Sequence, residues 1–281
     1  MQGQVVKVIS DQFFVDLENE VLVCKQRGKL RNLKTLPLVG DFVLIDKEKK
    51  VILEILPRKN EIIRPNVSNI DQALVVTSLK NPDFSTNLLD KLLVQLEINN
   101  IKPIICLTKK DLLKKSEFEL LESTIAYYKK IGYLVVENTE ILKIKKYLVS
   151  KVTVLIGQTG AGKSTLLNNL FKDLNLKTGE VSLALGRGRH TTRHVEIIKK
   201  GLIKVLDTPG FSALSFADYT PMMVRDAFIE FKNFPCPYKD CMHLKEGECK
   251  VKEAVSKKEI IESRYLNYKN FQEEFKTSKR W

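Results

Sequence analysis

The chain has 281 residues, of which 43% are hydrophobic, and this is enough apolar material for about two or three packed domains. Lysine and arginine number 47 against 34 acidic residues, so the formal net charge is +13. No apolar run approaches the roughly 18 residues that a membrane-spanning helix needs, which argues against a membrane protein. The charge has two explanations that composition does not separate: a lysine-rich proteome, or a polyanionic partner such as RNA.

Residues 1–62 alternate between short apolar runs and charged turns. Strands are predicted at 5–9, 13–17, 21–24, 42–45 and 51–55. Five short strands in so small a segment predict a β-barrel, with an OB-fold as the leading candidate. The basic loop at 25–31, with Lys25, Arg27, Lys29 and Arg31, either contacts phosphates or is a solvated hairpin.

Two buried strands are predicted at 73–77 and 102–107, separated by a leucine-rich helix over 87–98 that Ser85 or Thr86 caps. The tetrad Thr108-Lys109-Lys110-Asp111 follows the second strand and is similar to the N-K-x-D motif with which GTPases read guanine. An aspartate there accepts hydrogen bonds from guanine N1–H and the 2-amino group. Adenine lacks that donor pair, so ATP would leave the carboxylate unpaired. A simple helix N-cap is the alternative reading of the tetrad.

The stretch Gly157-Gln-Thr-Gly-Ala-Gly-Lys-Ser164 fits the P-loop pattern at every fixed position. A β-branched strand, 152–156, precedes it and a helical run, 165–171, follows. In such a loop the backbone N–H groups and the helix N-terminus hold phosphates, Lys163 reaches the β- and γ-phosphates, and Ser164 ligates Mg²⁺.

The loop 186–194 and the strand 202–206 carry the expected switch residues. Thr191 or Thr192 can ligate Mg²⁺, and the sequence does not separate the two. Asp207-Thr-Pro-Gly210 is a D-x-x-G motif in which Asp207 holds Mg²⁺ through water and the Gly210 N–H meets the γ-phosphate. Phe211 stands where many GTPases carry a water-orienting glutamine, so another group must take that role. His190 is the best candidate in the loop and His194 the weaker choice.

These motifs together define the expected nucleotide site. Its predicted residues are Thr108, Lys109, Lys110, Asp111, Ile156, Gly157, Gln158, Thr159, Gly160, Ala161, Gly162, Lys163, Ser164, Thr165, Thr191, Thr192, Asp207 and Gly210.

Near the C-terminus, Cys236, Cys241, His243 and Cys249 give the spacing C-x₄-C-x-H-x₅-C. The chain starts without the apolar stretch of a secretion signal, so this cluster favours metal over disulfides. Three thiolates and one imidazole suit a closed, structural zinc site, and unliganded cysteines in a loop are the alternative. Asp240 and Glu246 are expected to be surface charges. The downstream helix is expected to expose Lys250, Lys252, Lys257, Lys258 and Arg264, to RNA or to solvent.

The order of the motifs is unusual, because the base-reading tetrad precedes the P-loop by about fifty residues and ordinary GTPases have the reverse order. A circular permutation at a surface loop explains this without loss of packing. The predicted α/β fold is therefore an OB-fold barrel over 1–62, a circularly permuted P-loop GTPase domain over 63–217 and an α-helical zinc-binding domain over 218–281.

The tetrad, the P-loop, the G-R-G-R-H-T-T loop, D-T-P-G-F and the terminal zinc pattern resemble the ribosome-small-subunit-dependent GTPase A (RsgA) family over nearly the whole chain. The resemblance implies a cytoplasmic bacterial factor that binds the 30S subunit and its 16S rRNA late in maturation. It implies ribosome-stimulated hydrolysis of GTP to GDP, with Mg²⁺ and one structural Zn²⁺, and His190 as the catalytic histidine. We expect a monomer.

Two other functions are compatible with parts of this pattern. The chain could be chiefly an RNA-binding assembly module whose guanine-nucleotide site regulates binding with little turnover. A P-loop ATPase or kinase is disfavoured by Asp111.

Overall fold

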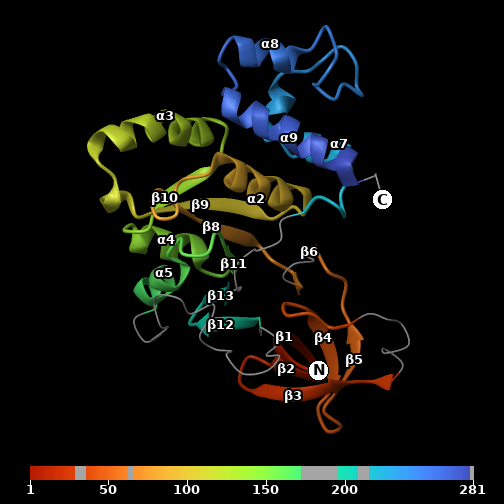
Figure 1. Ribbon diagram of the computed structural model, residues 1–281. Helices are drawn as coiled ribbons and strands as arrows, with labels where there is room; N and C mark the ends of the chain where they lie inside the picture. The colour runs from red at the N-terminus through yellow and green to blue at the C-terminus, as the bar shows by residue number, and fades with distance from the viewer. Residues whose placement is uncertain (29–35, 63–65, 172–194, 208–214, 279–281) are drawn as a thin grey trace. The chain divides into compact units, whose positions relative to one another are not determined.

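The structure is a computed structural model that describes residues 1–28, 36–62, 66–171, 195–207 and 215–278 (Figure 1). Two compact units form from segments that alternate along the chain. The first unit combines Met1–Leu74 with Asn138–Phe211, and the second combines Val75–Glu137 with Ser212–Trp281. The limits of these two units do not coincide with the limits of the three predicted domains, which remain predictions. No helix in the described ranges is both long and apolar enough to cross a bilayer.

A five-stranded barrel begins the first unit. Its strands are β1 (Gln2–Ile9), β2 (Gln12–Asp16), β3 (Val21–Gln26), β4 (Phe42–Asp46) and β5 (Val51–Ile55). They pair in the order β1-β2-β3-β5-β4, and β1 closes the ring by pairing with β4. The β3–β5 pair is parallel, whereas β1–β2, β2–β3 and β4–β5 are antiparallel. This ring confirms the OB-like barrel that the sequence predicts.

The interior of the barrel is filled by alternate residues of its strands, as the period of two in the sequence requires. Val5, Val15, Cys24, Val43 and Ile52 are all fully buried. Cys24 is therefore a core residue, as expected.

A buried carboxylate fixes the connection between the barrel and the short hairpin of β6 (Glu61–Ile62) and β7 (Val67–Ser68). Asp41 is fully buried, and the Arg58 guanidinium donates to both of its oxygens, at 2.7 and 2.8 Å. Gly40 precedes it with a φ of +101°. A Cβ on Gly40 would lie 2.0 Å from the carbonyl oxygen of Ser68, so the two chain segments approach too closely for any side chain.

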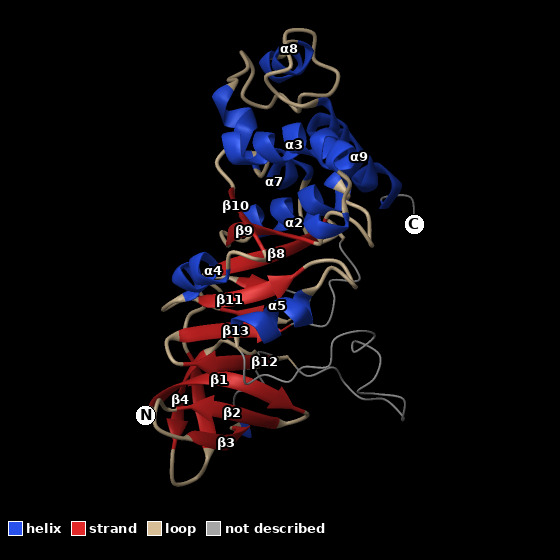
Figure 2. Cartoon of the chain, turned by 90° about the vertical axis from the view of Figure 1, so that its left-hand side faces the viewer, coloured by secondary structure: helices blue, strands red, loops and turns tan. Residues whose placement is uncertain are grey.

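The first barrel strand also belongs to a larger sheet, as Figure 2 shows. β1 pairs with β12 (Glu196–Lys200), β12 with β13 (Ile203–Asp207), and β13 runs parallel to β11 (Val152–Ile156). Lys7 bonds Glu196 at 2.6 Å and Lys199 bonds Asp16 at 2.8 Å along this junction. Among the described residues, this unit holds the helices α4 (Ile141–Leu148) and α5 (Lys163–Leu170).

The second unit is built on β8 (Gln72–Ser78), β9 (Lys102–Thr108) and β10 (Leu134–Glu137), in the order β10-β9-β8. Its helical elements are α2 (Thr86–Ile98), the 3₁₀ turn η1 (Lys110–Leu112), α3 (Lys115–Lys130), α7 (Pro221–Asp226), the 3₁₀ turn η2 (Ile229–Asn233), α8 (Lys250–Ser256) and α9 (Glu262–Ser278). The Ser85 hydroxyl caps α2 by accepting the Leu88 N–H, as one of the two predicted caps. Val94 of α2 and Tyr127 of α3 share one hydrophobic core with residues of α7, α8 and α9.

The prediction that Arg264 is exposed is wrong. Its side chain is fully buried, with 0% of its surface accessible, whereas Lys250, Lys257 and Lys258 are exposed as expected and Lys252 is half-buried. Arginine side chains are usually exposed, but a charged group can be fully buried when it is paired and hydrogen-bonded. The partners of Arg264 are distant in sequence, so no local pattern predicts them.

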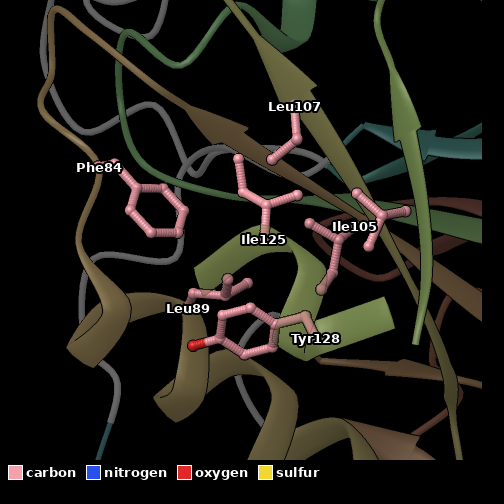
Figure 3. Close-up of a pocket in the computed structure, with 7 residues that line it drawn as sticks. Phe84, Leu89, Ile105, Leu107, Ile125 and Tyr128 are labelled. Atoms are coloured by element: carbon pink, nitrogen blue, oxygen red, sulfur yellow. The ribbon is translucent and has the colours of Figure 1, made fainter. Parts of the chain in front are cut away.

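Apolar side chains of α2, β9, α3 and β10 also surround a small hollow in this unit (Figure 3). Its lining residues are Phe84, Leu89, Ile105, Leu107, Ile125, Tyr128 and Val135. The Tyr128 hydroxyl donates to Asp90 at 2.6 Å, and the remaining lining side chains are hydrocarbon. The hollow therefore has nothing with which to hold a nucleotide, and it is packing space in the core.

Gly40→Ala should destabilise the protein more than Gly132→Ala. Both glycines have a φ above +100°, but a Cβ on Gly132 would meet nothing within 4 Å. Gly132→Ala should therefore lower the free energy of unfolding only by the cost of a strained backbone, on the order of 1–3 kcal/mol. Gly40→Ala adds the clash with Ser68. Denaturant unfolding measures both, and equal losses would show that the Gly40–Ser68 contact is unimportant.

Candidate functional site

The P-loop lies where a fully buried strand meets a helix. β11 is buried along its whole length, and Ile156 at its end is 1% exposed. Gly160 and Gly162 then have φ values of +80° and +96°, which a side chain would strain. Gly162 is the N-cap of α5, so the curled loop leads directly into the helix N-terminus. This is the strand–loop–helix arrangement that phosphate binding requires.

Lys163 lies over this loop. Its ammonium donates to the carbonyl oxygens of Gly157 and Gln158, at 2.8 and 2.9 Å. Ser164 and Thr165 follow in the first turn of α5, half-buried and exposed respectively. The loop thus combines a lysine cation, a helix N-terminus and an accessible serine, which are the groups needed to bind a triphosphate and its metal ion.

Asp207 is brought to the same edge of the sheet as the P-loop. It is the last residue of β13, and its backbone is level with Leu155 in the parallel strand β11. The carboxyl ends of parallel strands meet at one edge, so the start of the D-x-x-G motif and the start of the P-loop are neighbours. Gly210, His190, Thr191, Thr192 and His194 lie outside the described residues.

The base-reading tetrad leaves β9 in the second unit. Thr108 is buried, Lys109 has a left-handed φ of +58°, and Asp111 lies exposed in η1. The N-cap of η1 is Lys109, with no side-chain cap bond, so the N-cap reading of the tetrad is not what the structure shows. The exposed carboxylate of Asp111 is accessible to a donor pair on a base edge.

Two lysines brace this turn in a way that sequence reasoning missed. The Lys109 ammonium donates to the carbonyl oxygen of Asn81. The Lys110 ammonium bonds Glu137 at 2.6 Å and lies 4.5 Å from the centre of the Phe118 ring. Glu137 is the last residue of β10, so this ion pair links the tetrad to the end of the strand that lies beside β9.

The four predicted zinc ligands converge. Their ligand atoms all lie within 4.8 Å of one another. His243 Nδ1 is 3.5, 3.4 and 3.4 Å from the sulfurs of Cys236, Cys241 and Cys249, and the Cys236 and Cys249 sulfurs are 3.8 Å apart. A tetrahedral zinc with ordinary bond lengths separates a nitrogen and a sulfur ligand by about 3.5 Å and two sulfurs by about 3.8 Å. The observed spacings therefore fit a four-coordinate zinc ion.

Groups around this cluster hold the ligands in place. The Glu246 carboxylate accepts the N–H groups of Met242 and Leu244, at 2.8 and 2.7 Å, so its predicted role as a plain surface charge is wrong. The Tyr265 hydroxyl donates to the His243 carbonyl at 2.7 Å. Burial, with the nearby Arg225 charge, lowers the pKa of His243, which favours the neutral imidazole that binds metal.

Comparison with known proteins gives full-length matches. The chain matches the family model RsgA N-terminal domain over residues 2–51 and the model RsgA GTPase over residues 55–217. It is 45% identical to the small ribosomal subunit biogenesis GTPase RsgA 2 of Oceanobacillus iheyensis, covering 99% of this chain and 98% of that protein. It is 43% identical to the small ribosomal subunit biogenesis GTPase RsgA of Bacillus cytotoxicus, with the same coverage.

Solved structures agree. YjeQ from Thermotoga maritima superposes with a TM-score of 0.84 at 34% identity, covering 97% of both chains. YloQ, described as a circularly permuted GTPase, superposes with a TM-score of 0.81 at 35% identity, covering 99% of this chain and 95% of that one. The permuted motif order thus has direct structural precedent.

Asp111→Asn should exchange guanine recognition for xanthine recognition. The amide presents a donor where the carboxylate presents an acceptor, so GDP affinity should fall by at least about a hundredfold and xanthosine diphosphate should bind instead. Titration calorimetry with both nucleotides measures this. Asp83→Asn, at another exposed aspartate of the same unit, should change neither affinity. Unchanged GDP binding by the Asp111 variant would remove Asp111 from the site.

Protein purified without chelator should contain one zinc per chain, and Cys241→Ser should lose it. The lost metal should loosen the C-terminal helices, because ligand binding and folding are coupled at such sites. Nucleotide binding at the P-loop should persist. Elemental analysis gives the stoichiometry, and Cys24→Ser, in the barrel core, should keep its zinc. Absence of zinc from the wild type would contradict the assignment.

Proposed function

The chain belongs to the RsgA family of GTPases and is a GTP hydrolase that acts in biogenesis of the small ribosomal subunit; we propose that it binds the 30S subunit and that the subunit stimulates its turnover. The observation that carries the catalytic part is the P-loop, with Lys163 over the loop carbonyls and Asp207 at the same sheet edge. Phosphoryl transfer to water depends mainly on positioning and charge stabilisation, which such an edge supplies.

We assign the roles of the residues as follows. The loop N–H groups and Lys163 hold the β- and γ-phosphates, and Asp111 selects guanine, with Lys109 beside it. Ser164 and either Thr191 or Thr192 would ligate Mg²⁺, and Asp207 would hold it through water. The ion would neutralise the charge that develops on the phosphates. The Gly210 N–H senses the γ-phosphate. His190 orients the attacking water, since Phe211 has no group that can do so.

The zinc proposed at Cys236, Cys241, His243 and Cys249 would be structural, because all four positions of a tetrahedral ion are taken by protein. It would hold the loops between η2 and α8 in one shape. This suits a recognition surface rather than a reaction centre.

The net charge of +13 fits a ribosomal partner, and we propose 16S rRNA as the surface contacted. In the barrel, Lys25 is exposed near the end of β3 and Arg27 just after it. Near the C-terminus, Lys250 is exposed on α8, and Lys257 and Lys258 are exposed just after it. Lys250 and Lys257 both bond Glu253, at 2.8 and 2.7 Å, so α8 offers less free charge than its sequence suggests. We propose that the protein is a monomer in the bacterial cytoplasm. We also propose that it has three domains, 1–62, 63–217 and 218–281.

Turnover of GTP should rise when 30S subunits are added and not when 50S subunits are added. His190→Ala should keep GTP affinity but lose the stimulated rate, because water is organised only on the way to the transition state. His194→Ala is the matched control and should stay stimulated. Phosphate release under multiple turnover measures all three proteins. A wild type that binds 30S without stimulation would favour the RNA-binding module with a regulatory nucleotide site.

A further inference from the structure

A buried ion network joins the C-terminal helices to α2. Arg264 of α9 donates through Nη1 to Asp90 of α2 at 2.6 Å. Its Nε and Nη2 donate to the two oxygens of Glu230 in η2, at 2.7 and 3.2 Å. Arg264 and Asp90 are fully buried and Glu230 is 2% exposed. Three charged groups from three separate elements are thus withdrawn from water together.

Neighbouring polar groups complete the network. Asp90 also accepts the Tyr128 hydroxyl of α3 at 2.6 Å and the Asn267 amide of α9 at 2.7 Å. The guanidinium carbon lies 4.7 Å from the centre of the Phe228 ring. Such a network is favourable only when every member is satisfied, so removal of the arginine would leave two buried carboxylates unpaired.

A second contact holds α9 to α2 further along both helices. Lys91 of α2 bonds both oxygens of Glu274, at 2.8 and 2.9 Å, and its ammonium lies over the rings of Phe216 and Phe271. Phe216 is 2% exposed and its ring centre is 5.1 Å from that of Phe271. The Gln95 amide of α2 donates to the carbonyl oxygen of Ser215 at 3.0 Å. The chain downstream of the D-x-x-G motif is therefore fixed to α2 from Ser215 onward.

These contacts place two functional features in one body. The zinc cluster is held by α9, since Tyr265 bonds the His243 carbonyl. The base-reading turn leaves β9, the strand that follows α2. We propose that Arg264 is a positioning residue for ribosome-stimulated GTP hydrolysis, because it fastens the zinc-bearing helices to α2 and so makes the zinc cluster and the Thr108–Asp111 turn move together.

This inference rests on the proposed action on the 30S subunit. A ribosomal contact on the zinc-bearing helices would then set the position of the base-reading turn without a separate hinge. The opposing arrangement is a zinc-bearing arm that swings freely relative to α2. If the helices are fastened to α2, loosening the α2–α9 contact lowers the stimulation of GTP turnover by 30S subunits. If the arm swings freely, loosening that contact leaves the stimulation unchanged.

Three variants test the proposal in the full-length protein. Arg264→Met removes the charge and leaves Asp90 and Glu230 unpaired. Arg264→Met/Asp90→Asn/Glu230→Gln replaces the network by neutral groups of similar shape, which a buried site tolerates better than a broken pair. Lys143→Met breaks an exposed ion pair with Glu140 at the start of α4, away from the proposed rRNA surface, and is the control. For each variant, the experiment measures amide hydrogen exchange, zinc content and GDP affinity. It also measures GTP turnover with and without 30S subunits.

Arg264→Met should keep one zinc, GDP affinity and basal turnover. Amides of α9 and of residues 216–231 should exchange faster by at least about a hundredfold, as expected when a buried pair is broken. Stimulation by 30S should fall by about tenfold, within the range of site-to-site coupling. The triple variant should recover both protection and stimulation, and Lys143→Met should match the wild type.

If the amides of Arg264→Met exchange hydrogen at the wild-type rate, the proposal is wrong, whatever the effect of 30S subunits on turnover. Faster exchange with full stimulation would also overturn it and favour the swinging arm. A triple variant that regains protection but stays unstimulated would show that fastening alone is not the role of Arg264. A wild type that 30S does not stimulate would overturn the proposed function and the positioning role with it, while the exchange data would still decide whether Arg264 fastens the helices.

Discussion

A guanidinium group that loses all contact with water must be surrounded by acceptors, and this requirement organises the second unit. Arg264 satisfies it with carboxylates from α2 and η2, and Asp90 in turn takes hydrogen bonds from α3 and α9. Each of these elements must therefore be in place before the charge is compensated. The shared aromatic core around Phe228, Tyr268 and Phe271 supplies the apolar burial, while the network fixes which faces meet.

The first unit obeys a different constraint, the continuity of a sheet. Because β1 pairs with both β4 and β12, one strand serves the barrel and the sheet that carries the P-loop. The parallel pairing of β11 with β13 then brings Asp207 level with the strand that enters the loop. The arrangement of the P-loop thus depends on backbone geometry in one unit, whereas the tetrad and the Cys₃His cluster are held by side-chain contacts in the other.

Sequence reasoning succeeded where the signal is local. Period-two alternation gave the five barrel strands, the fixed glycines gave the P-loop, and the cysteine spacing gave the four converging ligands. The prediction that Arg264 is exposed was wrong, because its partners Asp90 and Glu230 lie 174 and 34 residues away. No local sequence pattern indicates such distant partners. Sequence reasoning likewise missed the Lys110–Glu137 pair, which only the adjacency of β9 and β10 creates. The role of His190 stays a prediction.

The Arg264 network implies that β8, β9 and β10 and the helices around the Cys₃His cluster form one rigid body in both nucleotide states. The most direct measurement is the distance distribution between a probe on α3 and a probe just after α8. Genetically encoded residues at Leu120 and Lys258 would carry the probes, so that Cys236, Cys241 and Cys249 stay untouched. Pulsed electron resonance would compare GDP with a non-hydrolysable GTP analogue. We predict one narrow distribution that is the same for both nucleotides. A shifted or broadened distribution in either state would contradict the claim.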